Sequence, residues 1–561
     1  MTTPEVWAPQ ARRVESLTDG TRKQLAPRGD GWWHAEEPLE HGESYAFSLD
    51  AGRPLPDPRS RWQPDGVHGA SRALDHAAFE WSDRSWRGIA REDLILYELH
   101  VGTFTPFGTF AAIEDKLDHL LDLGITAVEL MPIAEFPGSR GWGYDGVDLY
   151  APHHSYGEPG DLKRFVDRCH ARGLAVIIDV VYNHLGPDGN YLAEFGPYFT
   201  DRYGTPWGSA VNLDGPDSEP VRDFFIENAL MWMRDYHFDG IRLDAVHAIF
   251  DASAVHFLEE LKARAEELER ILDRRLLVIA ESDLNDPRVV LPRARGGYGL
   301  DAQWSDDFHH ALHAVITGER TGYYADFGAI GQIAKALQHA FVYDGVYSAY
   351  RRRRHGRSTE GLTGHAFLGY IQNHDQVGNR ALGERLTALV SGDLGKVAAA
   401  LVLTSPFIPL IFQGEEWGAT SPFNYFTDHN RELGAAVSRG RKREFAAFGW
   451  PEEQIPDPQD EATFVRSKLN WSELEDPIHA DLFEWYRRLI TLRKSVPELC
   501  DGRMDLVRTE IDEVARWLLV RRGSITLACN FSEHDVVVPV RADERRTEVL
   551  TSALKPPESV T

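Results

Sequence analysis

Cysteine is scarce in this chain, with three in 561 residues: Cys169, Cys500 and Cys529. An odd number of cysteines scattered far apart supplies neither a disulfide framework nor the ligand spacing of a metal site. We therefore interpret all three as small core residues without a catalytic role, and we favour a reducing compartment.

Basic charge and long apolar runs are also lacking. The 87 acidic residues outnumber the 60 basic ones, and this balance excludes the electrostatic footprint of a protein that binds nucleic acid or anionic lipid. A neutral or small substrate is favoured. The most apolar run, residues 397–412, is broken by prolines and is shorter than the roughly 20 residues that span a bilayer, so it predicts a buried helix entering a buried strand. The first residues lack a basic stretch followed by an apolar one, so we expect a cytoplasmic protein.

The length of the chain is enough for two or three domains. Residues 1–90 show short apolar segments between Asp-Gly and Gly-Asp-Gly turn signals, which predict a β-sandwich, expected to be immunoglobulin-like and of the carbohydrate-binding type. Residues 501–561 predict a small C-terminal all-β domain with strands at 517–520, 525–530 and 536–540.

Residues 91–500 alternate short apolar runs with helical patterns. Eight runs are strand candidates: 94–99, 125–131, 174–181, 240–246, 276–281, 301–304, 366–373 and 409–413. Strands without polar alternation are buried on both faces, and eight such strands with helical crossovers close into a (β/α)8 TIM barrel. A helix near 481–498 would be the last of the barrel. Long loops at 184–220 and 303–365 follow the third and sixth strands, on the face where such barrels carry their active sites.

Three carboxylates follow strands four, five and seven. Arg242 and Asp244 point to the same face because strand side chains alternate, and a nearby cation keeps a carboxylate ionised and available as a nucleophile, although a structural ion pair explains the motif equally well. Glu281 emerges from an apolar strand, where desolvation raises the pKa of an acid as a proton donor requires. Asp375 follows His374 at the same rim. Any one acid could cap a helix or hold a loop, but three at one rim favour glycoside hydrolysis by paired carboxylates.

At these residues the sequence resembles the α-amylase family of glycoside hydrolases. Its four signature segments occur in order as Asp179-Val-Val-Tyr-Asn-His184, Gly240-Ile-Arg-Leu-Asp244, Ala280-Glu281-Ser282 and Asn373-His374-Asp375. The resemblance implies a retaining mechanism with Asp244 as nucleophile, Glu281 as general acid/base and Asp375 as stabiliser of the transition state. It also implies that Tyr144 stacks on the sugar and that His184, Arg242 and His374 bond hydroxyls or the nucleophile.

Within the family, the chain is most similar to hydrolases that release trehalose from maltooligosyltrehalose. The likeness lies in residues 98–106, 141–146, 279–288, 304–310 and 372–380. It implies cleavage of the α-1,4 bond next to a terminal trehalose, as a step of trehalose biosynthesis downstream of an enzyme that forms maltooligosyltrehalose. The substrate contacts it implies beyond those above are Leu243, Ala245, Val246, His247, Asp306, Asp307, Phe308, His309, His310, Gln376, Val377, Gly378 and Asn379.

The sequence gives little support for a metal site or a cofactor site. The segment Asp306-Asp307-Phe308-His309-His310 contains four competent metal ligands, but the resemblance assigns it to sugar hydroxyls. We find no acidic cage for the structural calcium that many relatives carry, and Asn183 alone is not evidence for one. We expect no metal and no cofactor.

Alternatives remain open at this stage. A glycogen branching enzyme or another α-glucan transferase shares the barrel and the acids, and a debranching enzyme that cuts α-1,6 bonds is a further possibility. A non-catalytic glucan-binding protein is disfavoured because all three acids are present. Six aromatic residues near the rim suit either sugar stacking or core packing: Trp207, Trp304, Tyr323, Tyr324, Trp417 and Phe426.

Overall fold

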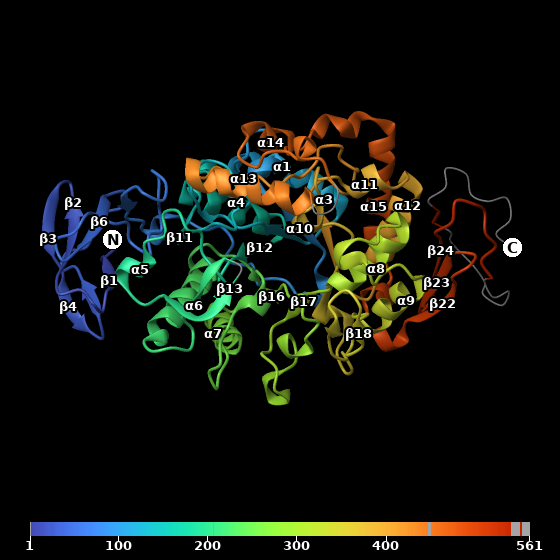
Figure 1. Ribbon diagram of the computed structural model, residues 1–561, viewed down its shortest axis with the longest axis horizontal. Helices are drawn as coiled ribbons and strands as arrows, with labels where there is room; N and C mark the ends of the chain where they lie inside the picture. Colours follow the sequence, from blue (N-terminus) through green and yellow to red (C-terminus); the bar gives the residue numbers. More distant parts are fainter. Residues whose placement is uncertain (1, 206, 447–449, 540–549, 552–561) are drawn as a thin grey trace.

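The computed structural model describes residues 2–205, 207–446, 450–539 and 550–551. Figure 1 shows an elongated molecule with the N-terminal strands at one end, the central β/α unit in the middle and a small sheet of C-terminal strands at the opposite end. Among the described residues, none of the helices combines the length and the apolar character needed to cross a bilayer.

Seven short strands form two antiparallel sheets before residue 73. One sheet has the order β1-β5-β4 and the other β3-β2-β6-β7. The strands are β1 Glu5–Trp7, β2 Val14–Thr18, β3 Thr21–Gln24, β4 Ala26–Gly29, β5 Trp32–His34, β6 Ser44–Leu49 and β7 Ser71–Arg72. Buried Trp7, Val14 and Phe47 supply their core. The predicted N-terminal sandwich is thus present.

Eight parallel strands close into a barrel in the order β12-β15-β16-β17-β20-β21-β8-β9. They are β8 Leu96–Leu99, β9 Ala127–Leu130, β12 Ala175–Val180, β15 Gly240–Leu243, β16 Leu277–Ala280, β17 Ala302–Trp304, β20 Phe367–Gly369 and β21 Ile408–Phe412. Each lies within one of the eight predicted runs or overlaps it, so the predicted (β/α)8 barrel is confirmed. A short hairpin, β10 Ala134–Glu135 with β11 Asp148–Pro152, follows β9.

Alternation along each strand separates two apolar layers. Leu96, Ile177 and Leu410 belong to a cluster inside the barrel. Ile241 and Leu243 belong to the larger cluster between the strands and the helices. Because side chains of a strand alternate with period two, Arg242 between them projects into the barrel, as predicted.

Sixteen described helices surround the barrel or its rim. They are α1 Val101–Phe104, α2 Phe110–Glu114, α3 Leu117–Leu123, α4 Pro159–Ala171, α5 Leu192–Phe195, α6 Ser218–Asp235, α7 Phe257–Leu272, α8 Asp306–Thr317, α9 Ile330–His339, α10 His374–Gly378, α11 Leu386–Leu389, α12 Gly392–Leu403, α13 Arg431–Ala446, α14 Glu461–Arg466, α15 Pro477–Ser495 and α16 Pro497–Cys500. In α15, Asp476 caps the first turn, and apolar side chains at three- and four-residue steps bury one face. The predicted last helix and the buried helix α12 before β21 are confirmed.

The two long segments predicted as loops contain regular structure. Residues 184–220 hold α5 and the hairpin β13 Phe199–Thr205 with β14 Gly208–Val211. Residues 303–365 hold α8, α9 and the hairpin β18 Tyr347–Ser348 with β19 Arg353–Arg354. The prediction of an open loop was wrong for the second segment, since the buried face of α8 packs on the barrel and fixes the helix there.

The C-terminal sheet has the order β22-β23-β24, with β22 Arg508–Asp512, β23 Trp517–Arg522 and β24 Ile525–Asn530. The strands predicted at 517–520 and 525–530 are confirmed. The strand predicted at 536–540 was wrong for residues 536–539, which form no strand, and residue 540 lies outside the described residues. The strand β22 was missed because its residues are mostly polar and exposed.

All three cysteines are free thiols. Cys169 in α4 and Cys529 in β24 are buried, and Cys500 in α16 is half-buried. Burial raises the pKa of Cys169 and Cys529, the latter to about 12, so these two thiols stay protonated and pack as small apolar groups.

Candidate active site

Three carboxylates stand where three barrel strands end. Asp244 follows β15, Glu281 follows β16, and Asp375 lies in the first turn of α10 after β20. The carboxyl ends of parallel barrel strands meet at one rim, so the three acids predicted from the sequence are brought together. We call Asp244, Glu281, Asp375 and Arg242 the carboxylate rim.

Arg242 binds two of these acids. Its Nη1 lies 3.0 Å from Asp244 Oδ1, and its Nη2 lies 3.6 Å from Glu281 Oε2. Nη1 also donates to Oδ2 of Asp179 on β12 at 2.7 Å, and the guanidinium carbon lies 4.3 Å from the centre of the Trp304 ring. The guanidinium is thus enclosed by anions and an aromatic face, which hold it charged and in place.

A second donor fixes the orientation of Asp244. Nδ2 of Asn183 donates to Asp244 Oδ2 at 2.8 Å, while Arg242 occupies the other oxygen. His184 bonds Asn183 Oδ1 through one ring nitrogen and lies 3.0 Å from the carbonyl oxygen of Tyr144 through the other. Because both oxygens of Asp244 are held by fixed donors, its side chain cannot rotate freely.

A hydrogen-bonded chain runs from Asp179 back to Glu98. The hydroxyl of Tyr144 donates to Asp179 Oδ2 at 2.6 Å and lies 2.7 Å from His374 Nε2. Since the phenol has one hydrogen, Nε2 must donate to it. His374 Nδ1 lies 2.5 Å from Glu98 Oε1, which also requires a hydrogen on nitrogen. Burial lowers the pKa of His374, but the Glu98 carboxylate outweighs burial and raises it, which suits this doubly protonated ring.

Glu281 differs from Asp244 in its electrostatics. Burial raises the pKa of Glu281 well above its ordinary value. Arg242 opposes this effect, whereas the charges of Asp244, Asp306 and Asp375 reinforce it. Glu281 therefore carries a proton near neutral pH, while the direct ion pair with Arg242 belongs to Asp244.

The backbone next to Asp244 positions that proton. Ala245 adopts a left-handed conformation with φ 40°, which is strained for a residue with a Cβ. In this conformation its N–H donates to Glu281 Oε2 at 2.6 Å. Because Oε2 already accepts this bond, the proton of Glu281 belongs on Oε1.

Asp375 faces solvent. Its Oδ1 accepts a hydrogen bond from Asn379 Nδ2 at 2.6 Å, one turn further along α10. The surrounding protein raises the pKa of Asp375, and the neighbouring His374 lowers it. An open carboxylate held from one side can bond a sugar placed above it.

The structure separates the residues 306–310 into two groups. Asp306 accepts a hydrogen bond from Tyr370, and burial raises its pKa to about 7. Oδ2 of Asp307 accepts the N–H groups of residues 342 and 343, Phe308 packs on Phe407, and His309 is buried. Only Asp306 of the segment retains appreciable exposure; His310 is buried and bonds the carbonyl oxygen of Asp306. Asp306 influences Glu281 directly, whereas the next three side chains hold α8 in place.

The remaining predicted substrate contacts also fall into buried packing residues and polar residues near the rim. Leu243, Val246 and Val377 are buried in apolar clusters. Gln376 lies within hydrogen-bond reach of Tyr323 and Tyr324. The other predicted contacts lie at the ends of β15 and α10 and have these placements: His247 half-buried with Nδ1 3.9 Å from Asp283, Gly378 with its carbonyl bonded to Arg441, and Asn379 exposed.

Of the six aromatic candidates, two are open to solvent. Trp207 stacks on the ring of His184 with centroids 4.3 Å apart, and Tyr323 is similarly exposed. The other four are buried and serve packing: Trp304, Tyr324, Trp417 and Phe426. The exposed pair can stack sugars; Trp304 instead supports Arg242 from inside the barrel.

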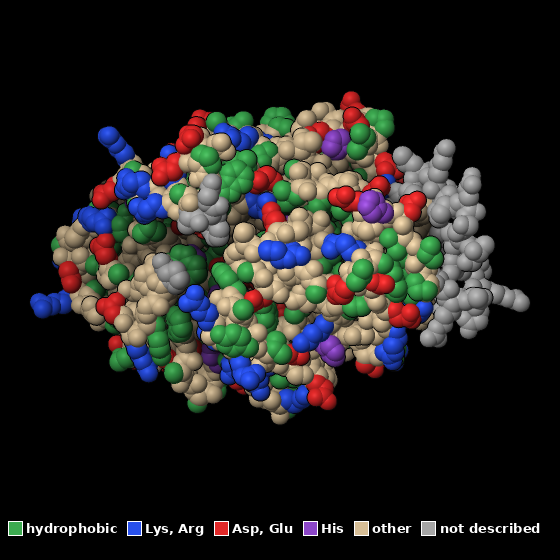
Figure 2. All heavy atoms as spheres, turned by 45° about the vertical axis from the view of Figure 1, so that its right-hand side comes forward, with side chains coloured by type: hydrophobic (Ala, Val, Ile, Leu, Met, Phe, Trp, Pro, Cys, Tyr) green, Lys and Arg blue, Asp and Glu red, His purple; other side chains and the backbone are tan. Residues whose placement is uncertain are grey.

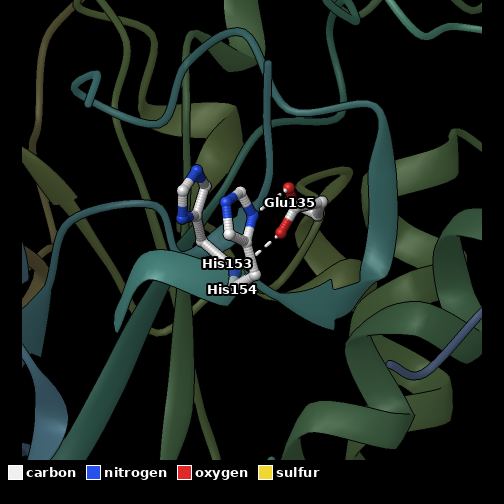
Figure 3. A group of neighbouring side chains, drawn as sticks. All are labelled: Glu135, His153 and His154. Carbon is white, nitrogen blue, oxygen red and sulfur yellow. Dashed lines mark hydrogen bonds and ion pairs between the residues drawn. The ribbon is translucent and has the colours of Figure 1, made fainter. Parts of the chain in front are cut away.

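Within the described residues, one group of three side chains has ligand atoms close enough for a metal: Glu135, His153 and His154. Figure 3 shows the two imidazoles lying face to face, with His154 bonded to Glu135. Their rings are 4.6 Å apart and tilted by 20°. An imidazole binds a metal in its own plane, so two nearly parallel rings cannot direct lone pairs at one ion. The group is a hydrogen-bonded support of the β10–β11 hairpin.

Sequence reasoning missed several residues that touch the rim. Glu98 and Asp179 project into the barrel from β8 and β12, and Tyr370 follows β20. Glu98 and Asp179 are polar within otherwise apolar strands, and that signal could have marked them, although Glu129 of β9 shows it as well. Asn183 was considered only as a possible metal ligand, whereas it bonds Asp244.

Two sequence families match the chain. The family described as Alpha amylase, catalytic domain matches residues 76–228, and the family described as Domain of unknown function (DUF3459) matches residues 505–560. Part of a branching enzyme is also similar: the 1,4-alpha-glucan branching enzyme GlgB of Bacillus caldolyticus is 36% identical over 54% of this chain and 50% of its own length.

Full-length similarity is stronger. The malto-oligosyltrehalose trehalohydrolase of Rhizobium sp. strain M-11 is 49% identical over 97% of this chain and 93% of its own length. The protein of the same name from Saccharolobus solfataricus is 46% identical over 94% of this chain and 90% of its own length. A crystal structure from Salmonella typhimurium, named for alpha amylase, is 40% identical, with a TM-score of 0.90 over 96% of this chain and 93% of its own length. This chain belongs to the malto-oligosyltrehalose trehalohydrolase family, within the α-amylase family of glycoside hydrolases.

Proposed function

We propose that this chain is a retaining glycoside hydrolase that cleaves the α-1,4-glucosidic bond next to the terminal trehalose of maltooligosyltrehalose, releasing trehalose and a shortened maltooligosaccharide. The observation that carries the chemistry is the unequal treatment of two neighbouring acids: Arg242 pairs closely with Asp244, while burial raises the pKa of Glu281. A nucleophilic carboxyl group paired with a cation, beside a second carboxyl group with a raised pKa, is what retaining glycoside hydrolysis requires. The substrate comes from the names of the relatives.

In the first step, Asp244 attacks the anomeric carbon of the glucose whose bond is cut. Arg242 and Asn183 hold its two oxygens, so the attacking carboxylate is oriented before the substrate arrives. Oε1 of Glu281 gives its proton to the glycosidic oxygen, and trehalose leaves with that oxygen. The enzyme keeps the glucosyl unit on Asp244 as an ester.

In the second step, Glu281, now ionised, removes a proton from water. The water oxygen attacks the anomeric carbon, the bond to Asp244 breaks, and the maltooligosaccharide is released. Asp375 stabilises the positive charge that develops on the sugar ring in both steps. His374 and Tyr144, ordered by Glu98 and Asp179, hold the same sugar.

Around these groups we propose the substrate-binding set predicted from the sequence, divided by the contacts of each residue. The side chains proposed to bond sugar are those of the half-buried or exposed His247, Asp306 and Asn379 and of the buried His184 and Gln376. The residues that act through backbone or packing are Leu243, Ala245, Val246, Asp307, Phe308, His309, His310, Val377 and Gly378.

The context of the reaction is also proposed. An enzyme that forms maltooligosyltrehalose must supply the substrate, and the absence of disulfides among the described residues suits the cytoplasm. We divide the chain into residues 1–90, 91–500 and 501–561, with the catalytic groups on the middle unit.

The test is to incubate the purified protein with maltooligosyltrehalose and, separately, with a plain maltooligosaccharide of equal length, and to resolve the products by chromatography. Free trehalose from the first and little change in the second is the expected result. New branch points or redistributed chains without trehalose would favour the transferase, which the partial likeness to a branching enzyme keeps as the second candidate. No product from either would contradict both.

A further inference from the structure

A second site lies where the N-terminal strands meet the outer wall of the barrel. A cavity of about 130 Å³ is enclosed there by the first residues of the chain, the segment after β6, the strand β11 and the helix α6. Four arginines contribute to its wall: Arg59, Arg61, Arg72 and Arg234. The volume is roughly ten times what a single buried water needs. We call it the arginine cavity.

Three of these guanidinium groups form no direct ion pair in the described part of the chain. Among the described residues, Arg59, Arg61 and Arg72 form no ion pair with any carboxylate within 4.0 Å, and Nε of Arg72 is buried without a hydrogen bond. Arg234 is different, because its Nε lies 2.9 Å from Asp235. The cavity wall therefore holds four guanidinium groups against three carboxylates, and within the described residues Arg59, Arg61 and Arg72 have no direct ion pair.

The acids in the wall are engaged elsewhere. Asp57 accepts hydrogen bonds from the hydroxyl of Tyr45 at 2.7 Å and from the backbone N–H of residue 59 at 2.8 Å. Glu227 pairs with Arg264 at 2.7 Å, outside the cavity wall, and its other oxygen lies 3.8 Å from Nη1 of Arg234. Glu5 pairs with Arg28 at 3.2 Å. Asp57 and Glu227 attract Arg59 through space, but none of the three carboxylates lies within 4.0 Å of the guanidinium groups of Arg59, Arg61 or Arg72.

Aromatic rings hold the arginines in position without neutralising them. The guanidinium carbon of Arg59 lies 5.2 Å from the ring centre of Trp32, 5.6 Å from that of Tyr150 and 5.5 Å from that of Phe224. Arg72 lies 4.8 Å from the ring centre of Trp62. Such contacts orient a cation, but an aromatic ring carries no net charge, so the positive charge of the arginines remains.

Arginine is the side chain best suited to bind a tetrahedral oxyanion, because its planar donors match two oxygens at once. Several unmatched guanidinium groups around one cavity suit a ligand with more than one negative charge. We propose that the arginine cavity binds a small phosphate-bearing anion, which joins the N-terminal strands to helix α6. Free phosphate and the phosphate group of a sugar ester share this chemistry.

The position of the site gives the ligand a structural consequence. Arg61 and Arg72 belong to the N-terminal part of the chain, while Tyr150 and Arg234 belong to the barrel unit. An anion that contacts both parts binds only when they are packed together. Binding therefore stabilises the folded chain by an amount that rises with the logarithm of ligand concentration over its dissociation constant. It does so at a site that contains none of the residues of the carboxylate rim.

The first experiment measures binding of inorganic phosphate to the full-length protein by calorimetry, in parallel with thermal unfolding. We expect saturable binding of one phosphate per chain and an unfolding midpoint that rises with the logarithm of phosphate concentration once this exceeds the dissociation constant. Sodium chloride at matched ionic strength controls for screening, and it should give a much smaller rise. A hexose phosphate is the second probe. Tighter binding of the ester identifies sugar phosphate as the preferred source, and weaker binding of the ester identifies free phosphate.

Variants locate the site. The double variant Arg61→Gln/Arg72→Gln should bind phosphate about tenfold or more weakly, since two charge-assisted contacts are lost. The matched control is Arg12→Gln, which removes one charge from an exposed side chain of the same N-terminal part and should leave binding unchanged. Thermal unfolding without phosphate confirms that the double variant folds; if it does not, Arg61→Gln alone is used.

Three results would overturn the proposal: no saturable phosphate binding, equal stabilisation by chloride, or unchanged affinity in the variants. The last would place the phosphate elsewhere, for example at Arg242. All measurements are made without glucan, so they are independent of the proposed hydrolysis.

Discussion

The carboxylate rim and the arginine cavity use the same side chain in opposite ways. At the rim, the guanidinium of Arg242 contacts the carboxylates of Asp179 and Asp244 and lies 3.6 Å from the protonated Glu281, so fixed anions match its charge. In the cavity, Arg59, Arg61 and Arg72 lack such partners among the described residues. A matched arginine positions catalytic groups for a neutral sugar, whereas unmatched arginines attract an anion.

The difference shows that overall charge is a poor guide to a local site. The chain carries a formal net charge of -27, and Figure 2 shows acidic and basic side chains interspersed over one face of the molecule. Long-range fields of exposed charges are screened within about 10 Å in ordinary buffer. What a site binds depends on which charges its own walls leave unmatched.

The largest effect is expected from breaking the matched pair at the rim. Asp244→Asn removes the nucleophile but keeps the shape of the side chain, so kcat should fall by about 10⁴-fold or more while the unfolding midpoint changes little. Trehalose release under saturating substrate measures the loss. Asp283→Asn is the control at a half-exposed neighbouring acid. Near-normal turnover of Asp244→Asn would show that another group is the nucleophile.

The next effect concerns the proton on Glu281. Glu281→Gln cannot protonate the leaving oxygen, so cleavage of the natural substrate should fall by about 10²- to 10⁴-fold. Substrates whose leaving group is a good phenolate need no proton and should lose less in the first step. Burst kinetics with an aryl glucoside and steady-state rates with the natural substrate give the two values. Equal losses on both substrates would count against the acid role.

A smaller effect should separate two adjacent acids inside the barrel. Glu98 and Glu129 are paired in register on β8 and β9, but only Glu98 contacts His374. Glu98→Gln removes the charge that raises the pKa of His374, so we expect about a 10- to 100-fold loss of kcat. As the pH is raised, the variant should also lose activity at a lower pH than the unaltered enzyme does, because His374 loses its proton earlier. The pH profile of kcat is the readout.

Glu129→Gln is the matched control. Both carboxyl oxygens of Glu129 are buried without a hydrogen-bond partner, and burial raises its pKa well above the ordinary value, so it is already neutral. The substitution should change kcat by no more than about twofold. Equal effects of the two substitutions would mean that Glu98 acts through packing alone.

The smallest effect tests the field around Glu281. Burial raises the pKa of Asp306 to about 7, so above that pH its charge adds to the fields that keep Glu281 protonated. A carboxyl group with a raised pKa donates its proton up to a higher pH, and activity is lost as pH rises through that pKa. Asp306→Asn should therefore move the alkaline limb of kcat/KM to lower pH. The control Asp505→Asn, at an exposed site, should leave the pH profile unchanged. An unchanged profile for Asp306→Asn would show that the charge of Asp306 does not affect Glu281.

Part of this architecture is local enough to be predicted from sequence. The eight barrel strands are visible because each is a continuous apolar run, and Arg242 and Asp244 share a face because strands alternate. The segment 303–365 was harder, since α8 owes its stability to packing on the barrel rather than to its own pattern. The polar strand β22 is defined by pairing with β23, which no local signal reveals.

The sequence by itself determined the strand order along the chain, the three acids at strand ends and the family to which they point. Tertiary structure alone decided which charges are matched. Glu98 and His374 are 276 positions apart, and their contact exists because the barrel closes between β20, β21 and β8. The arginine cavity likewise forms only where the N-terminal strands pack on α6. Charge–charge energies depend on distance and burial, and neither is fixed until the chain has folded.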